Sequence, residues 1–240
     1  MHGSTFPDAQ LPGQILFSKV AGSHSFNLAM PESDMDYLAV YIAPTEKVLS
    51  IDPPPETLDH KGPDWSAHEV GKFCRLLLKG NPNMVETLFT SKLACGLDPW
   101  WSLLQAKRTL FLTKRVVLQY LGYCQAQLHK LVAHSGTGGL HTSGGAYNTK
   151  WAYHMVRLVQ DADAISSGME PVLWKEGPER DMLMEVRRGE WTQGNVENLV
   201  RHKISSIDAR KPWHLPDEGD RVVLNEWLLG IRCWYMMEKR

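Results

Sequence analysis

Residues 22–37 read Gly22-Ser23-His24-Ser25-Phe26-Asn27-Leu28-Ala29-Met30-Pro31-Glu32-Ser33-Asp34-Met35-Asp36-Tyr37, and they lie between two runs that favour β-strands. The first run, residues 14–21, is mostly apolar and ends at the Gly-Ser pair, and the second, residues 38–42, follows the Asp-x-Asp pair. This order predicts a strand, a Gly-Ser turn, one or two helical turns, a Pro-Glu-Ser turn, and a strand that opens with Asp34 and Asp36.

The two acids of this stretch suggest a metal site. Alternate residues of a strand face the same side, so we expect Asp34 and Asp36 on one face. Two adjacent carboxylates repel each other unless a hard cation such as Mg²⁺ lies between them. The Gly22-Ser23 turn offers backbone N–H groups, a hydroxyl and a helix N-terminus, which suit an anionic phosphate. The alternative is a plain acidic turn, which the spacing between two β-prone runs disfavours.

A Gly-Ser turn followed about ten residues later by Asp-x-Asp entering a strand resembles the DNA polymerase beta nucleotidyltransferase superfamily. The residues of 22–37 are most similar to its RNA repair pathway polymerase-beta-like branch. Three further segments resemble the same branch: Lys72-Phe73, Leu77-Leu78-Lys79-Gly80-Asn81-Pro82-Asn83 with Glu86-Thr87-Leu88-Phe89, and His154-x-x-Arg157-Leu158. The resemblance covers most of the chain, but not residues 44–62 or the Gly-rich segment after residue 133.

A third carboxylate completes the metal site in this superfamily, on a strand beside the Asp-x-Asp strand, where it binds a metal and orients the attacking hydroxyl. Residues 64–68 are a candidate strand that leads into a helix. Asp64 lies at its start, on the face shared with Ser66 and His68, whereas Glu69 lies at the junction with the helix, on the other face. We favour Asp64 and keep Glu69 as the rival, whose structural alternative is an acid that complements the helix dipole.

The resemblance implies two-metal nucleotidyl transfer, with Asp34, Asp36 and Asp64 as catalytic residues that bind two Mg²⁺ ions, or Mn²⁺ in their place. It implies a nucleoside triphosphate such as ATP as donor and RNA as acceptor, in repair or end-processing. The expected nucleotide-binding residues are Gly22, Ser23, Ser33, Lys72, Asn81, His154 and Arg157. The alternatives are a catalytically silent nucleotide sensor or RNA-binding scaffold of the same fold, and the same chemistry on a protein or a small molecule.

Composition narrows the setting. The chain has 240 residues, of which 43% are hydrophobic and 22% charged, as in ordinary soluble proteins. Its formal net charge of −1 means that any RNA contact must come from a local basic patch. Its cysteines form no Cys-x-x-Cys pair, which argues against zinc and against a disulfide framework; they are Cys74, Cys95, Cys124 and Cys233. No run spans a bilayer and no signal peptide is visible, so we expect a cytoplasmic protein, with the nucleus as the alternative, and no membrane partner.

The periodicity predicts an α+β fold: a small mixed β-sheet forms the nucleotidyltransferase core in residues 14–92, followed by an α-helical half in residues 93–240 that walls the cleft. Residues 1–13 are expected to be a loosely ordered lead-in. Helices are expected at 69–79, 82–89, 113–133, 148–163, 178–188, 192–206 and 221–237. Short strands are expected at 47–51 and 171–174, and a flexible Gly/Ser-rich linker at about 134–147.

Overall fold

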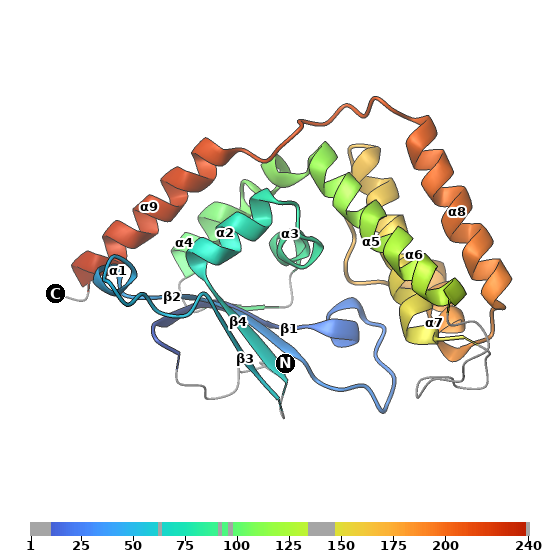
Figure 1. Ribbon diagram of the computed structural model, residues 1–240, viewed down its shortest axis with the longest axis horizontal. Helices are drawn as coiled ribbons and strands as arrows, with labels where there is room; N and C mark the ends of the chain where they lie inside the picture. The colour runs from blue at the N-terminus through green and yellow to red at the C-terminus, as the bar shows by residue number, and fades with distance from the viewer. Residues whose placement is uncertain (1–10, 62–63, 91–92, 96–97, 134–146, 239–240) are drawn as a thin grey trace. The chain divides into compact units, whose positions relative to one another are not determined.

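The computed structural model of the chain describes residues 11–61, 64–90, 93–95, 98–133 and 147–238 (Figure 1). The chain divides into two compact units. Unit 1 comprises residues 1–111 and 219–240, and unit 2 comprises residues 112–218. Unit 2 is therefore an insertion between two parts of unit 1.

Unit 1 contains a five-stranded mixed sheet with the strand order β3-β4-β2-β1-β5. Its strands are β1 (Gln14–Val20), β2 (Tyr37–Ile42), β3 (Thr57–His60), β4 (Trp65–Glu69) and β5 (Leu93–Cys95). β2 and β4 pair in parallel, and the other neighbours pair antiparallel. The expected α+β class with a small mixed sheet is confirmed.

The helices of unit 1 outside the turn after β1 are α1 (Thr45–Val48), α2 (Val70–Leu78), α3 (Pro82–Phe89), α4 (Asp98–Gln105), the 3₁₀ turn η2 (Arg108–Phe111) and α9 (Arg221–Glu238). Of these, α2 and α4 pack on one face of the sheet (Figure 1). Phe17 of β1 is fully buried, and its ring centroid lies 5.8 Å from that of Phe73 on α2 and 4.1 Å from that of Trp101 on α4. Aromatic contacts of this kind add to the burial of apolar surface, so they fix α2 and α4 on the sheet.

The joint between α2 and α3 follows from three consecutive residues. Gly80 adopts a φ of 74°, in the left-handed region that glycine tolerates. Asn81 then caps α3, because its side chain accepts a hydrogen bond from the backbone N–H of Met84, and Pro82 occupies the first turn. The short turn that the sequence predicts here is present.

Unit 2 consists of four helices in its described residues, namely α5 (Lys114–Ala133), α6 (Thr149–Ser166), α7 (Gly177–Arg188) and α8 (Gln193–Ala209). α6 packs against α5, α7 and α8. Consistent with this central position, most of the residues of α6 are buried. No helix in the described ranges combines the length and the apolar character that a membrane crossing requires.

Several local predictions differ from the structure. The strand expected at 47–51 is wrong, because residues 45–48 form α1, and residues 171–174 form no strand. β3 and β5 were not predicted as strands. The lead-in lies outside the described residues up to residue 10, and so does nearly all of the predicted Gly/Ser-rich linker. The sequence-based boundary at residue 92 also differs from the division into units, since β5, α4 and α9 belong to unit 1.

Candidate active site

Three strand ends meet at one edge of the sheet of unit 1. The backbone N–H of Ala21, just after β1, donates to the carbonyl oxygen of Asp36 at 2.8 Å. The backbone N–H of Tyr37 donates to the carbonyl oxygen of Asp64 at 3.0 Å. The parallel register pairs Tyr37 with Trp65, so Asp36 and Asp64 are the residues that directly precede two paired strands. Their backbones are therefore neighbours, as a pair of ligands on adjacent strands requires.

The side chain of Asp36 lies against Gly22. Gly22 has a φ of 63°, and a Cβ atom built there would lie 2.8 Å from Oδ2 of Asp36. Any other residue would both strain the backbone and displace the carboxylate. Gly22 therefore allows the Asp36 carboxylate to approach the turn that follows β1.

That turn is η1 (Gly22–Phe26), a 3₁₀ turn held by local contacts. The hydroxyl of Ser25 donates to the carbonyl oxygen of Gly22 at 2.7 Å, and the N–H of Leu28 donates to the carbonyl oxygen of Ser23 at 3.0 Å. Asn27 closes the turn with a φ of 61°. Phe26 and Leu28 are buried and anchor the turn in the core. This anchoring fixes the backbone conformation at Gly22 and Ser23.

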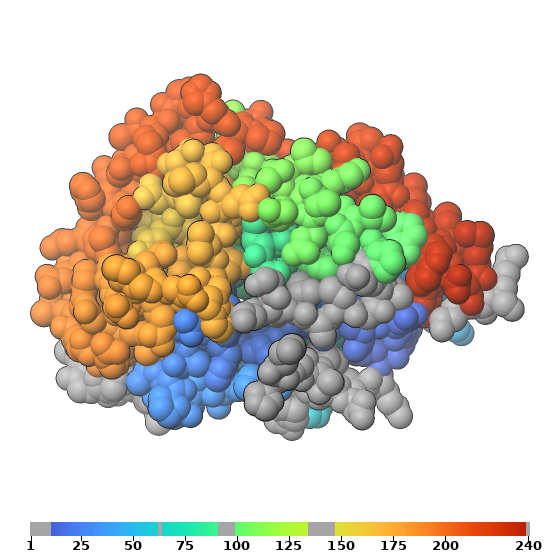
Figure 2. All heavy atoms as spheres, turned by 180° about the vertical axis from the view of Figure 1, so that it is seen from behind, coloured from blue at the N-terminus to red at the C-terminus, as the bar shows by residue number. Residues whose placement is uncertain are grey.

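A second turn brings the chain to the two acids. The hydroxyl of Ser33 accepts from the N–H of Met30 at 2.9 Å, and the carbonyl oxygen of Ser33 lies 3.2 Å from Nε2 of His24. The Ser33 side chain thus stabilises the turn. Asp34, which follows it, is exposed, and Asp36 is half-buried. The segment between η1 and β2, blue in Figure 2, forms part of the molecular surface.

Both acids precede β2, which begins at Tyr37, rather than opening the strand as expected. Alternation along a strand therefore does not by itself put Asp34 and Asp36 on one face. Asp36 is positioned instead by the close approach of its side chain to Gly22 and by the backbone contact between its neighbour Tyr37 and Asp64.

The two rivals for the third carboxylate lie at opposite ends of β4. Asp64 is exposed and adjoins Asp36 through the backbone, whereas Glu69 pairs in register with Tyr41. Asp64 and Glu69 are five positions apart along the strand direction, which corresponds to roughly 16 Å at about 3.3 Å per residue. The buried Glu69 caps α2 by accepting from the N–H of Gly71 at 2.7 Å, and it forms an ion pair with Arg232 of α9. Its contacts are those of a structural residue.

Two other predicted nucleotide contacts make structural interactions in unit 1. Lys72 lies in the first turn of α2, with its ammonium 3.8 Å from a carboxylate oxygen of Glu56. Asn81 is the cap of α3 described above. Contacts from either residue to a nucleotide stay predictions.

His154 and Arg157 belong to α6 in unit 2. Arg157 is fully buried, and its Nη1 lies 2.9 Å from Oδ2 of Asp161. The other oxygen of Asp161 accepts from Nζ of Lys175 at 3.1 Å, and the same Nζ lies 2.8 Å from Glu179. Arg157 is thus part of a buried ion network, while His154 is half-buried beside the ring of Tyr153. A role for the pair in nucleotide binding stays a prediction.

Lys19 is a candidate residue that the sequence reasoning missed. It lies on β1 opposite Leu38, two residues along β2 from Asp36, and is only 4% exposed. A lysine is rarely buried without a partner of opposite charge, so its burial at this position is unusual for a core residue. The available signal was a lysine inside the apolar run of residues 15–20.

The donor set at this edge fits a divalent metal by its chemistry, because carboxylate oxygens are the ligands that Mg²⁺ prefers. Within the ranges that the structure describes, however, no three His, Cys, Asp or Glu side chains come together closely enough to hold a metal ion. The structure thus brings the backbones of Asp36 and Asp64 together, with Asp34 two residues before Asp36 in the chain. Mg²⁺ or Mn²⁺ binding by them stays a prediction.

Comparison with known proteins accords with this arrangement. The sequence model of the RNA repair pathway DNA polymerase beta family matches residues 7–207, which include the Gly-Ser turn, the three acids and most of unit 2. A search of the curated proteins and a search of the solved structures gave no match. The family match spans well over half of the chain. The chain therefore belongs to the RNA repair pathway DNA polymerase beta family.

Proposed function

We propose that this protein is a metal-dependent nucleotidyltransferase that transfers a nucleoside monophosphate from a nucleoside triphosphate to an RNA acceptor. The observation that carries the proposal is the sheet edge at which Asp36 packs against Gly22 and adjoins Asp64. Membership of the RNA repair pathway family supports nucleotidyl transfer and favours RNA over a protein or a small molecule as the acceptor.

Each residue of the edge has a distinct role in this proposal. Asp34, Asp36 and Asp64 would hold the metal, which supplies Lewis-acid stabilisation of the phosphoryl oxygens when bound. The backbone N–H groups of η1 at Gly22 and Ser23, together with the side-chain hydroxyl of Ser23, are offered to the triphosphate. Asp64, on the neighbouring strand, orients the attacking hydroxyl of the acceptor. Positioning of donor and acceptor then supplies a large part of the acceleration.

The test is transfer of label from each nucleoside triphosphate, ATP included, in Mg²⁺ or Mn²⁺, to RNA, protein or small-molecule acceptors. We expect label on RNA. We expect Asp36→Asn to abolish transfer without unfolding the protein, because asparagine keeps the volume of the side chain but removes the charge that a metal requires.

The matched control is Glu32→Gln, which removes an exposed acid from the same turn and should leave transfer intact. Near-normal turnover of folded Asp36→Asn in Mg²⁺ would contradict the metal assignment. Label on protein alone would contradict RNA as the acceptor, and the absence of label on every acceptor would favour a silent nucleotide sensor.

A further inference from the structure

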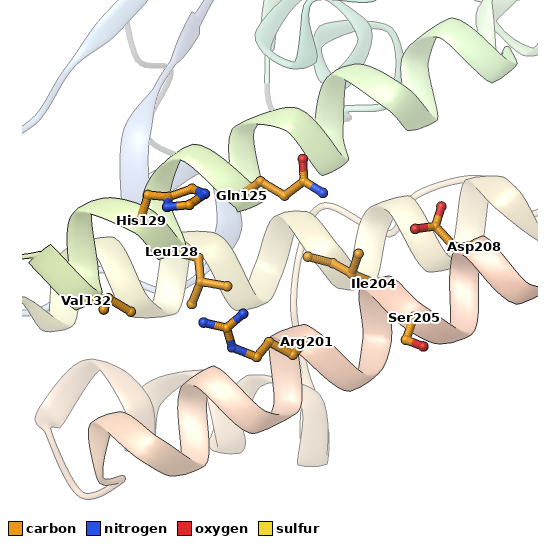
Figure 3. A pocket seen from close by; sticks show the side chains of 8 residues that line it. All are labelled: Gln125, Leu128, His129, Val132, Arg201, Ile204, Ser205 and Asp208. Carbon is orange, nitrogen blue, oxygen red and sulfur yellow. The ribbon is translucent and has the colours of Figure 1, made fainter.

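A groove of about 660 Å³ runs between α5 and α8 within unit 2. Its walls are one stripe of each helix, spaced i, i+3, i+4 and i+7, as Figure 3 shows. The lining residues are Gln125, Leu128, His129 and Val132 from α5, and Arg201, Ile204, Ser205 and Asp208 from α8. The volume lies in the range of ligand-binding pockets.

The groove has an apolar floor and polar walls. Leu128 is buried, and Ile204 and Val132 flank it with partly exposed surface. The remaining lining side chains carry hydrogen-bonding or charged groups, so the stripes do not form the continuous apolar seam by which two helices close on each other. A helical peptide would require such a seam, which disfavours a protein segment as the occupant.

The groove is lined by one guanidinium, from Arg201, and one carboxylate, from Asp208. Asp208 is held by Lys211 at 2.7 Å, which offsets its negative charge. The side chain of Arg201 is 60% exposed, and its Nη2 lies 3.8 Å from a carboxylate oxygen of Glu197. Glu197 also accepts a hydrogen bond from Gln193 at 2.8 Å. A guanidinium has five N–H donors, so most of those of Arg201 are available to a phosphate.

These groups match the recognition of single-stranded RNA. Unpaired bases stack on imidazole rings, such as that of His129 on the α5 wall, and Arg201 on the α8 wall offers its guanidinium to a phosphate. In Figure 3, Arg201 extends from α8 towards Leu128 of α5. The amide of Gln125 and the hydroxyl of Ser205 are suited to base edges and to the ribose 2′-hydroxyl.

We infer that this groove binds an unpaired nucleotide of the RNA acceptor, with its base over Leu128 and its phosphate at Arg201. The choice of RNA rests on the function proposed above. The groove itself rests on separate residues, all in unit 2, so the two ideas are tested separately.

The experiment measures binding of a fluorescently labelled single-stranded RNA octamer to the full chain by anisotropy, in EDTA and without nucleotide, over a range of salt concentrations. Arg201→Ala should weaken binding about tenfold, as loss of one charge-assisted contact implies. The slope of log K against log salt should become shallower by about 0.7, the value for one lost phosphate contact on a single strand. His129→Ala should weaken binding with less change in slope, because a stacking contact releases no counterion.

The matched control is Arg221→Ala, which removes an exposed arginine from α9 in unit 1 and should leave both affinity and slope unchanged. DNA of the same sequence should bind more weakly than RNA. Equal affinity of Arg201→Ala and Arg221→Ala would overturn the inference, and so would equal binding of RNA and DNA.

If transfer is absent in all assays but Arg201→Ala still weakens RNA binding, the proposed function fails and the groove stands. If transfer occurs and Arg201 has no effect on RNA binding, the function stands and the groove fails.

Discussion

At the scale of single residues, Gly22 and Asp36 lie against each other although they are fourteen positions apart in the sequence. The positive φ of Gly22 turns the chain, and the missing side chain leaves the space that Oδ2 of Asp36 approaches. An alanine in a left-handed conformation costs about 1–2 kcal/mol, and here it would also push the carboxylate away. The Gly-Ser and Asp-x-Asp motifs are therefore one structural unit, which explains why their spacing carries information.

Variants of Asp64 and Glu69 test which of the two acids is the third metal ligand. We expect Asp64→Ala to remove nucleotidyl transfer with little loss of stability, because Asp64 is exposed. We expect Glu69→Ala to lower the free energy of unfolding by about 3 kcal/mol, since it removes the α2 cap and leaves Arg232, whose side chain is 12% exposed, without its carboxylate. Chemical denaturation and a transfer assay on both variants measure the two effects.

Arg232→Leu provides the control for this pair. In a double-mutant cycle, its effect on stability should be smaller in the Glu69→Ala background than in the parent, because the two side chains share one ion pair. Full activity of Asp64→Ala together with an inactive but stable Glu69→Ala would reverse the assignment and make Glu69 the third ligand.

At the scale of elements, α6 organises unit 2 through two sets of ion pairs. Asp161 joins Arg157 of the same helix to Lys175 in the segment before α7. Asp163 binds Lys203 at 2.6 Å and also pairs with Arg210, so it links α6 to the end of α8. The first set is buried and the second is partly exposed, which predicts different responses to mutation and to pH.

Arg157→Ala should mainly destabilise unit 2. Removing one partner of a buried pair typically costs about 3–5 kcal/mol, and Lys175 remains to offset part of the charge of Asp161. Urea unfolding measures the loss, with exposed Lys150→Ala on the same helix as the control. Titration with a non-hydrolysable triphosphate tests the role expected from the sequence: normal stability with roughly tenfold weaker binding would make Arg157 a phosphate contact instead.

Asp163 gives the contact between α6 and α8 a pH dependence. Burial raises the pKa of Asp163, but hydrogen bonds and charges from Lys203 and Arg210 outweigh it and leave the pKa below its usual value. A carboxyl with a lowered pKa in the folded state stabilises the protein above its unfolded pKa, and this contribution is lost as pH falls through the folded pKa.

We therefore expect Asp163→Asn to have a lower melting temperature than the parent at pH 7, and the difference to shrink as the pH falls below about 4, the usual pKa of an aspartate. Thermal unfolding of both proteins across this range measures it. A difference that stays constant down to the lowest pH would show that the effect is not electrostatic.

Sequence patterns predicted the long elements better than the short ones. The helices from 113 to the end have apolar stripes over several turns, and all of them are present. Residues 47–51 contain a β-prone run, but they have no neighbouring strand, and α1 forms instead at 45–48. β3, with the sequence Thr57-Leu58-Asp59-His60, is a strand because β4 pairs with it, which no local pattern reveals.

The same limit applies to the candidate site. Local sequence identified Gly22, Asp34 and Asp36 as candidates, since motif spacing is a local property. The adjacency of Asp36 and Asp64 depends on the pairing of β2 with β4, and the choice between Asp64 and Glu69 depends on contacts with α9. These long-range contacts are what the sequence alone did not supply.

At the scale of the whole molecule, α9 returns the chain to unit 1. The indole N–H of Trp227 donates to the carbonyl oxygen of Trp100 at 2.8 Å, and Arg232 binds Glu69 and the carbonyl oxygen of Ala43. Amphipathic patterning shows that a helix packs, but not against which partner. The sequence therefore assigned α9 to the helical half.

The connections between the two units are suited to an insertion. In unit 1, a Cβ atom built at Gly219 would lie 2.9 Å from Cδ1 of Phe111. The last residue before unit 2 and the first residue after it are therefore in close contact. In unit 2, Lys114 pairs with Asp217 at 2.9 Å and Arg115 pairs with Glu218, which holds the first and last residues of that unit together. These acids also offset the unfavourable position of two cations at the start of α5.

The adjacency of residues 111 and 219 predicts that unit 1 folds without unit 2. Replacing residues 112–218 by a Gly/Ser linker of about four residues, a common length for a connection, should give a folded protein with a single cooperative unfolding transition. All three candidate metal ligands lie in unit 1, so this protein should bind Mn²⁺, measured by electron paramagnetic resonance, as the parent does. The control is the same deletion variant without residues 219–240, so that it also lacks Trp227 and Arg232 of α9. It should lose the cooperative transition, because Trp100 and Glu69 then have no partners on α9. An unfolded first variant would show that unit 1 requires unit 2, and equal stability of both would show that α9 is not part of its fold.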